Sequence, residues 1–151
     1  MSAAAFTLRA YRAADEEAAI ELWRRTWQLA YPQLDFTARL AWWRQRWRDE
    51  LVPTTMITVA ESAGQMVGFV TVDPNTLYLD QIVVAPEAWG SQLAGALLTE
   101  AKRLSPAGLD LAVNADNGRA IRFYEKQGFV VIGAGVNPRS GAPVHQMAWR
   151  P

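Results

Sequence analysis

The 151-residue chain contains no cysteine and only one histidine, His145. Without cysteine there is no thiol nucleophile, disulfide or thiolate metal ligand, and one histidine cannot build a multi-histidine metal centre. We therefore expect no metal. No hydrophobic run approaches the length of a membrane span, and residues 1–5 lack the basic and apolar regions of a signal peptide. These features predict a cytoplasmic protein with no membrane partner.

The chain also lacks an excess of charge of either sign, because fifteen Lys and Arg residues balance fifteen Asp and Glu residues. The densest basic group, Arg44, Arg46 and Arg48, is followed directly by Asp49 and Glu50. A nucleic-acid or anionic-membrane surface needs a basic patch, so we expect no nucleic-acid partner. Half of the residues are hydrophobic, which argues against disorder.

Apolar periodicity predicts one strand, two helices, three strands, and then helix, strand, helix and two strands. The predicted strands are 6–11, 56–61, 66–72, 76–84, 109–114, 129–132 and 144–149. Asp15 and Asp35 are suitable first residues for the first two helices, which Pro32 and Pro53 should end. The later helices are predicted at 93–104 and 117–127. This order predicts a mixed, mostly antiparallel α/β sheet flanked by helices, in a single domain of residues 1–151.

Two segments carry the functional signal. In the first, Asn117 and Tyr124 are seven residues apart, so they lie on one helix face about 10 Å from each other. Such a helix can anchor an extended ligand and supply a proton, although Asn117 also suits a helix cap and Tyr124 a half-buried core position. In the second, a strand leads through the small-residue loop 89–95 into a helix N-terminus. This arrangement is typical of an anion site, but also of an ordinary connection.

The pattern Asn-x-x-Ala-x-x-Phe-Tyr-Glu-Lys-x-Gly-Phe over residues 117–129 resembles the fourth helix of the GNAT (Gcn5-related) N-acetyltransferases. The resemblance is strong from Leu77 to Gly133 and covers the N-terminal half in element order only. It implies the GNAT fold, acetyl-CoA as cosubstrate, and direct acetyl transfer to a primary amine of a small molecule or peptide. Two alternatives stay open: another acyl donor, or a catalytically degenerate module that binds coenzyme A or a protein partner.

The resemblance also implies where the coenzyme binds. The pantetheine arm would follow the backbone of residues 82–84, and the pyrophosphate would lie in the loop 89–95. Two positions depart from the family pattern, because Trp89 replaces a usual Gln or Arg and Gln92 replaces a usual glycine. The implied cofactor-binding residues are Ile82, Val83, Val84, Trp89, Gly90, Ser91, Gln92, Leu93, Ala94, Gly95, Asn117 and Tyr124.

For catalysis, the resemblance implies that Tyr124 protonates the departing coenzyme A thiolate. Asp80, which strand alternation places on the face of Ile82 and Val84, is the candidate base, with a structural carboxylate as the alternative. Ala112 stands where ribosomal-protein acetyltransferases carry a glutamate, so their base is not carried over.

In the family the first two helices form one wall of the acceptor groove, and the loop between the last two strands forms the other. Trp27, Tyr31 and Trp42 are therefore candidates for the first wall, with core packing as the alternative. Arg139 is the candidate for the second wall, where it would meet an acceptor carboxylate; a solvated loop arginine is the alternative. The resemblance names no particular amine, and both a monomer and a homodimer remain open.

Overall fold

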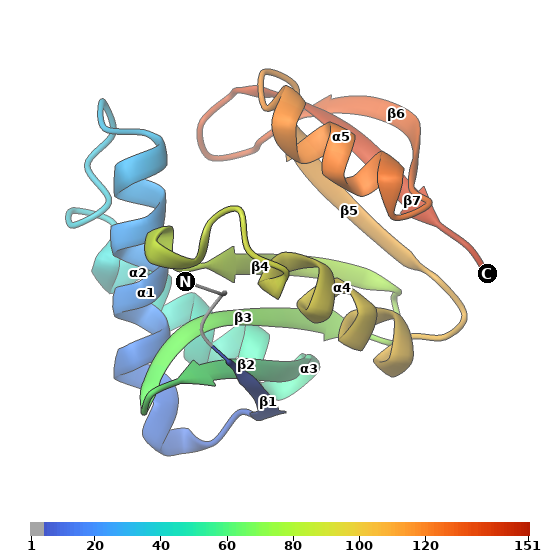
Figure 1. The fold of residues 1–151 in the computed structure, drawn as a ribbon. Coiled ribbons are helices and arrows are strands. Elements are labelled where there is room, and N and C mark those ends of the chain that lie inside the picture. The colour runs from blue at the N-terminus through green and yellow to red at the C-terminus, as the bar shows by residue number, and fades with distance from the viewer. Residues whose placement is uncertain (1–4) are drawn as a thin grey trace.

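A computed structural model describes residues 5–151 (Figure 1). Its regular elements are β1 (Thr7–Ala10), α1 (Glu16–Ala30), α2 (Leu40–Arg46), α3 (Val52–Thr54), β2 (Met56–Ser62), β3 (Gln65–Asp73), β4 (Tyr78–Val84), α4 (Leu93–Leu104), β5 (Leu109–Asn114), α5 (Gly118–Lys126), β6 (Val130–Val136) and β7 (Pro143–Trp149). The strands form a seven-stranded sheet in the order β1-β2-β3-β4-β5-β7-β6. All neighbours are antiparallel except β4 and β5. The predicted mixed, mostly antiparallel α/β sheet is confirmed.

The helices cover the two faces of the sheet differently. α1 and α2 pack on one face of β2 to β4, and α4 crosses the other (Figure 1). The α1–α2 side is rich in aromatic residues: Trp23 stacks on Trp43 with ring centroids 4.4 Å apart, and Trp47 is fully buried beside Phe69. Core packing therefore explains these three tryptophans.

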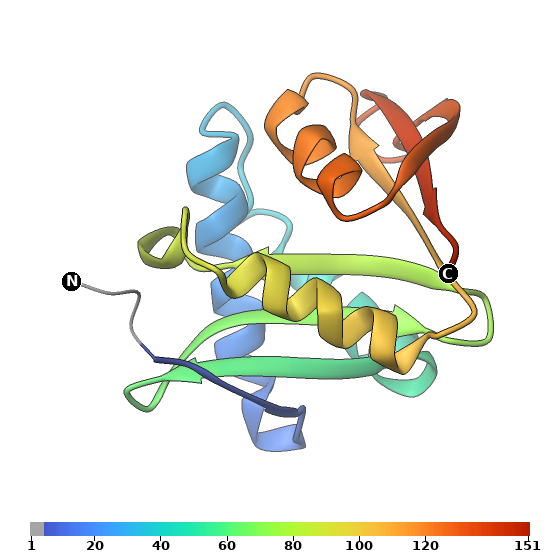
Figure 2. The same cartoon turned by 45° about the vertical axis from the view of Figure 1, so that its right-hand side comes forward.

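β4 and β5 are neighbours only where they begin. Tyr78 pairs with Asp110, and the Asp110 N–H donates to the Leu77 carbonyl at 2.7 Å. No further pair joins the two strands among the described residues, and Figure 2 shows them diverging from this point. β4 therefore has an open backbone edge along its second half, directly before the connection to α4.

Two element boundaries differ from the prediction in the N-terminal half. The second helix begins at Leu40 rather than at Asp35. The Asp35 carboxylate accepts from the Ala38 N–H at 3.0 Å and caps a turn that precedes the helix. The helix then widens into π-helical turns over Trp47–Leu51 and continues into α3. Pro53 consequently lies inside the last turn instead of ending the helix before it.

Two strand boundaries differ from the prediction by two or more residues. β4 begins at Tyr78 rather than at residue 76, because Leu77 has a φ of 66°, which is incompatible with an extended strand. β6 extends to Val136, beyond the predicted end at Ile132, because Gly133 to Val136 continue to pair with β7. Glycines in a strand weaken the sequence signal without preventing pairing.

Among the described residues, no helix combines the length and apolar character needed to cross a bilayer.

Candidate active site

The connection from β4 to α4 presents free backbone donors at the start of a twelve-residue helix. The Leu93 N–H bonds to the Ser91 hydroxyl at 3.2 Å, and the Ala96 N–H bonds to the Gln92 carbonyl at 3.0 Å. The Ala94 and Gly95 N–H groups have no acceptor within residues 5–151. Free N–H groups and the positive end of the helix dipole together favour an anion here.

The glycine that this loop requires is Gly90, whose φ is +79°. A side chain at Gly90 or Gly95 would meet no atom within 4 Å, so both positions border open space that a ligand can approach. Gln92 has a φ of −83°, which any L-residue adopts, and its side chain is exposed. The departure from the family glycine at this position therefore introduces no backbone strain.

The Trp89 side chain forms a hydrogen bond with β4 and not with the backbone groups at the start of α4. Its indole N–H donates to the Val84 carbonyl at 2.8 Å, although the residue is 44% exposed. The contact ties the loop to the unpaired part of β4. In the structure Trp89 therefore fixes the loop relative to the strand.

Residues 82–84 of β4, the predicted position of the pantetheine arm, direct alternate backbone groups toward the opening between β4 and β5. The Ala85 N–H donates to the Val67 carbonyl on β3, and Val83 lies opposite Phe69. Because antiparallel pairing alternates, the backbone groups of Ile82 and Val84 point away from β3 toward the opening. The side chain of Val83 is instead buried in the α1–α2 core.

α5 carries Asn117 at its N-terminus and holds Tyr124 in the apolar cluster against which Ile82 and Val84 pack. The Asn117 carboxamide oxygen accepts from the Ala120 N–H at 3.2 Å, so this residue does cap the helix. Tyr124 is 8% exposed and packs against Phe123 and Phe129, with ring centroids 5.3 Å and 5.5 Å away. Burial raises the pKa of the Tyr124 phenol, so its hydroxyl keeps its proton at neutral pH.

Asp80 does not share the face of Ile82 and Val84, and that prediction is wrong. Thr71 pairs with Gln81 and Val72 pairs with Leu79, so Asp80 is the extra residue of a β-bulge. A bulge resets the alternation of side chains.

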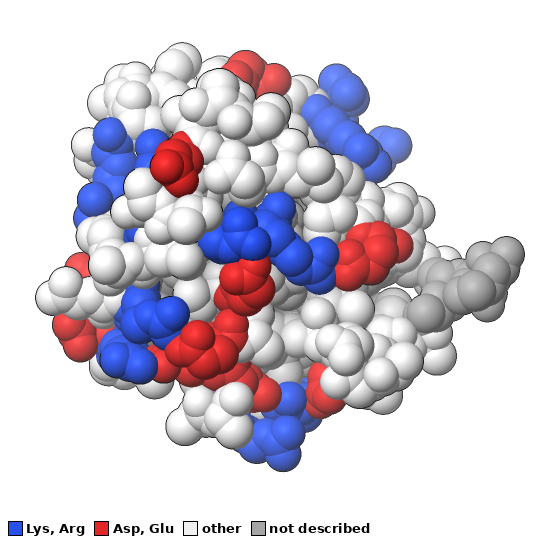
Figure 3. Space-filling model, turned by 90° about the vertical axis from the view of Figure 1, so that its left-hand side faces the viewer, with Lys and Arg blue, Asp and Glu red and all other residues white. Residues whose placement is uncertain are grey.

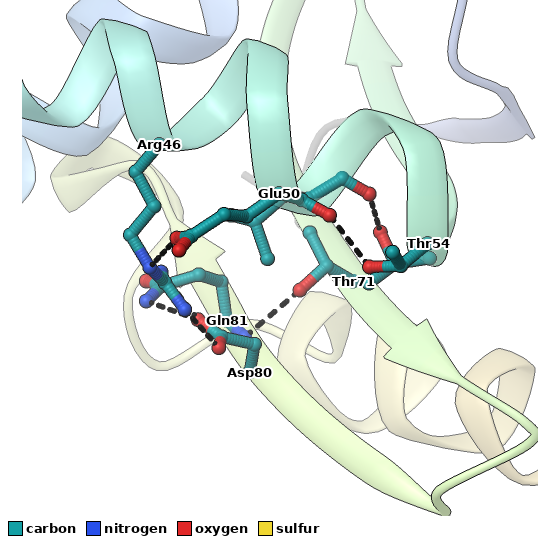
Figure 4. Close-up of polar contacts among 8 residues, drawn as sticks. Arg46, Glu50, Thr54, Thr71, Asp80 and Gln81 are labelled. Atoms are coloured by element: carbon teal, nitrogen blue, oxygen red, sulfur yellow. Dashed lines mark hydrogen bonds and ion pairs between the residues drawn. The ribbon is translucent and has the colours of Figure 1, made fainter.

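The bulge turns Asp80 toward α2 (Figure 4). Both carboxylate oxygens of Asp80 accept from the Arg46 guanidinium, at 2.9 Å and 2.5 Å, and the Gln81 amide adds a third bond at 3.0 Å. Tyr124 packs in the α4 cluster, on the other side of the sheet. The two predicted catalytic residues are therefore not brought together.

The predicted acceptor walls touch each other at one point. The guanidinium carbon of Arg139, on the β6–β7 loop, lies 3.3 Å from the centre of the Trp42 ring on α2. Trp27 stacks on Tyr31, with ring centroids 5.6 Å apart. The structure thus groups the four predicted acceptor residues into two pairs.

Sequence reasoning missed Asn114, the last residue of β5. Its amide donates to the Tyr31 hydroxyl at 2.6 Å and so joins β5 to the end of α1. The available signal was its position, because polar residues at the end of a strand that borders a parallel neighbour often lie at a site.

Charges are interspersed on the face that carries α1 (Figure 3). Arg25 on α1 pairs with Glu87 at 2.8 Å, and Arg48 pairs with Glu16 at 2.6 Å. Arg44 also pairs with Glu17. Within residues 5–151, this face therefore offers no extended patch of one sign.

Comparison with known proteins now identifies the family. Residues 16–129 match the Acetyltransferase (GNAT) family. The chain belongs to this family. The resemblance inferred from residues 77–133 is thereby confirmed, together with the assignment of the chain as an acyltransferase.

Individual relatives agree with this assignment. The peptidyl-lysine N-acetyltransferase YiaC of Escherichia coli (strain K12) is 27% identical over 135 residues, covering 87% of this chain and 88% of that protein. The PaiA N-acetyltransferase of Thermoplasma acidophilum, solved with coenzyme A, has a TM-score of 0.77 at 19% identity, covering 97% and 99% of the two chains. The ribosomal-protein-S18-alanine N-acetyltransferase of E. coli has a TM-score of 0.75 at 19% identity, covering 97% and 94%. The two structures show a shared fold.

Proposed function

We propose that this GNAT protein transfers the acetyl group of acetyl-CoA directly to a primary amine of a small molecule or peptide. The observation that carries the proposal is the opening between β4 and β5, which leads directly to the free N–H groups at the start of α4. A thioester arm and a diphosphate need these two features next to each other. The coenzyme A complex of PaiA, which shares this fold, supports the choice of ligand.

The described residues fit coenzyme A. The N–H groups of Ala94 and Gly95 would bind its pyrophosphate, and Gly90 gives the loop its left-handed turn. The inward backbone groups of Ile82 and Val84 would bind the amides of the pantetheine arm. The Val84 carbonyl is the exception, because Trp89 already occupies it.

Tyr124 is the proposed general acid. The amine attacks the thioester carbonyl, a C–N bond forms and the C–S bond breaks, and the Tyr124 hydroxyl gives its proton to the departing thiolate. The amine nitrogen loses its proton to solvent water, and solvent then returns a proton to the Tyr124 phenolate. Burial raises the pKa of the phenol, so the hydroxyl is protonated at neutral pH and gives up its proton only when it is held against the thiolate. Orientation of the two substrates supplies most of the remaining rate enhancement, and no acyl-enzyme is needed.

Asp80 takes a structural role in this proposal. A carboxylate held on both oxygens by a guanidinium is not free to accept a proton from the amine. The pair instead joins α2 to the bulge of β4, in agreement with the alternative that Asp80 is a structural carboxylate.

The acceptor amine is proposed to enter between the α1–α2 side and the β6–β7 loop. Trp27, Tyr31 and Trp42 would contact it from the first side and Arg139 from the second. The relative YiaC is named for peptidyl-lysine, which supports lysine-containing peptides among the candidate acceptors.

One observation favours the degenerate alternative, in which the protein binds coenzyme A without catalysis. Trp89 replaces a usual Gln or Arg and takes the Val84 carbonyl from the pantetheine strand. Calorimetry with acetyl-CoA, followed by a thiol-release assay on lysine peptides, polyamines and amino acids, separates the cases. Binding with release supports the transferase, binding without release on any amine supports the degenerate module, and no binding at millimolar coenzyme contradicts both.

A further inference from the structure

β6 ends the sheet with an uncharged and apolar edge. Four of its seven residues are large hydrophobic side chains that remain exposed: Val130 at 60%, Val131 at 47%, Ile132 at 59% and Val136 at 66%. No charged residue occurs from Gln127 to Pro138. An edge strand of this kind presents unpaired N–H and C=O groups together with apolar side chains, and so favours pairing with another strand.

The opposite edge of the same sheet is protected. β1 has only four residues, and Arg9 in its centre forms ion pairs with Asp15 and Glu61. Short length and paired charges are the usual means by which proteins block edge pairing. The chain therefore blocks one edge and leaves the other open.

The side chains of β6 leave room for a neighbouring strand. Val131, Ala134 and Val136 share the face of Met147, because each lies opposite a residue on that face of β7. On the other face, Gly133 and Gly135 lie against the side chain of Gln146 and add no bulk of their own. Arg139, the first charge after the strand, is held away from this edge by its contact with Trp42.

We propose that β6 is a dimerisation edge, at which two copies of this chain pair antiparallel about a twofold axis. An antiparallel strand is complementary to itself, so the contact closes after two copies. Because β6 carries no charged residue, pairing with a second copy would bury no unpaired charge. The bulge at Ile132 confines regular pairing to Gly133–Val136. Such a short contact buries less than the roughly 1,200–2,000 Å² of a standard interface, so the dimer should depend on concentration.

Light scattering and sedimentation over a protein concentration series test the proposal. The wild type should rise from 16.8 kDa toward twice that mass as concentration increases. The double variant Ile132→Lys/Val136→Lys should stay at the monomer mass with unchanged thermal stability, because both side chains are exposed. The matched control is Leu29→Lys on α1, which is 57% exposed and should dimerise like the wild type.

A cross-link tests the geometry independently of stability, because the chain has no cysteine of its own. Single cysteines at Val131, Ala134 and Val136 share one face, and the one nearest the twofold axis should form an intermolecular disulfide under mild oxidation. Leu29→Cys should not. A wild type that stays monomeric at the highest concentration, a dimer that survives the lysine substitutions, or assemblies larger than two copies would each overturn the proposal.

Discussion

The Arg139 guanidinium lies over the Trp42 ring, 3.3 Å from its centre, and so joins the β6–β7 loop to α2. The hydrogen bond from Asn114 to Tyr31 joins β5 to α1 in the same way. The strands β4 and β5 part after Tyr78, yet these two contacts reconnect the two sides of the opening. If the acceptor enters here, all four residues lie on its path.

Trp42→Ala should raise KM for the amine about tenfold and leave coenzyme A affinity nearly unchanged, because we propose that Trp42 faces the acceptor and not the coenzyme. Arg139→Gln should raise the same KM while lowering stability by about 1 kcal/mol or less, the usual value of an exposed cation–π contact. Arg103→Gln, which removes an exposed arginine far from the groove, serves as the control. If Trp42→Ala unfolds the protein easily but the folded fraction has normal kinetics, Trp42 is a core residue.

Gly90→Ala should weaken coenzyme A binding tenfold or more, because an L-residue resists a φ of +79° and the loop would move away from the phosphates. Gly64→Ala is a close control: Gly64 has a φ of +76° and is equally uncrowded, but it lies in the β2–β3 turn. Calorimetry should show normal affinity for the control.

Gln92→Gly should bind coenzyme A equally well or better, and a large loss of affinity would reveal a contact made by the Gln92 side chain.

Asp80→Asn and Arg46→Gln should each lower the free energy of unfolding by about 1–3 kcal/mol, because each breaks the charged hydrogen bonds between Arg46 and Asp80. Arg46→Gln also removes the exposed ion pair with Glu50. Turnover of the folded variants should stay within about threefold of the wild type. Chemical denaturation and steady-state kinetics measure the two effects separately. A hundredfold loss of turnover in Asp80→Asn, with Arg46→Gln unaffected, would restore Asp80 as the general base.

Local signals predicted most of the fold, and tertiary contacts explain the exceptions. Leu93–Leu104 and Gly118–Lys126 follow apolar periodicity within one segment, and both helices lie where that pattern placed them. The orientation of Asp80 depends on a bulge, which forms between β3 and β4 and is not encoded in β4 alone. The Asn114–Tyr31 bond joins residues 83 positions apart, beyond the reach of any local pattern.

Asp15→Asn should destabilise the protein by about 1–3 kcal/mol at pH 7. The Asp15 carboxylate accepts from Arg9 twice at 2.8 Å and from the Arg12 N–H at 2.7 Å before α1. The Arg9 hydrogen bonds hold the pKa of Asp15 below its usual value.

The lowered pKa gives this prediction a pH dependence. Stability from Asp15 should be fully present above the unfolded pKa of about 4 and should be lost as pH falls through the lower folded pKa. Denaturation at several pH values should therefore show the gap between wild type and variant shrinking below pH 4. A gap that stays constant down to pH 2 would mean that the ionised carboxylate contributes nothing.

Tyr124→Phe should leave the fold and acetyl-CoA affinity intact, because the ring still packs against Phe123 and Phe129 and the hydroxyl has no partner among the described residues. Turnover should fall by roughly 10² or more if the hydroxyl protonates the thiolate. Tyr11→Phe, which changes a tyrosine on the far side of the sheet, should keep normal turnover.

The burial of Tyr124 adds a second test of the same role. Because burial raises the pKa of Tyr124 above the usual value near 10, the acid should stay protonated and kcat should not fall through its ionisation up to about pH 10. A loss of turnover below tenfold in Tyr124→Phe has two explanations: an unassisted thiolate, or product release that limits the wild-type rate. Rapid-quench measurement of the transfer step separates them. If that step is unchanged in the variant, Tyr124 serves packing alone and the thiolate leaves without an acid.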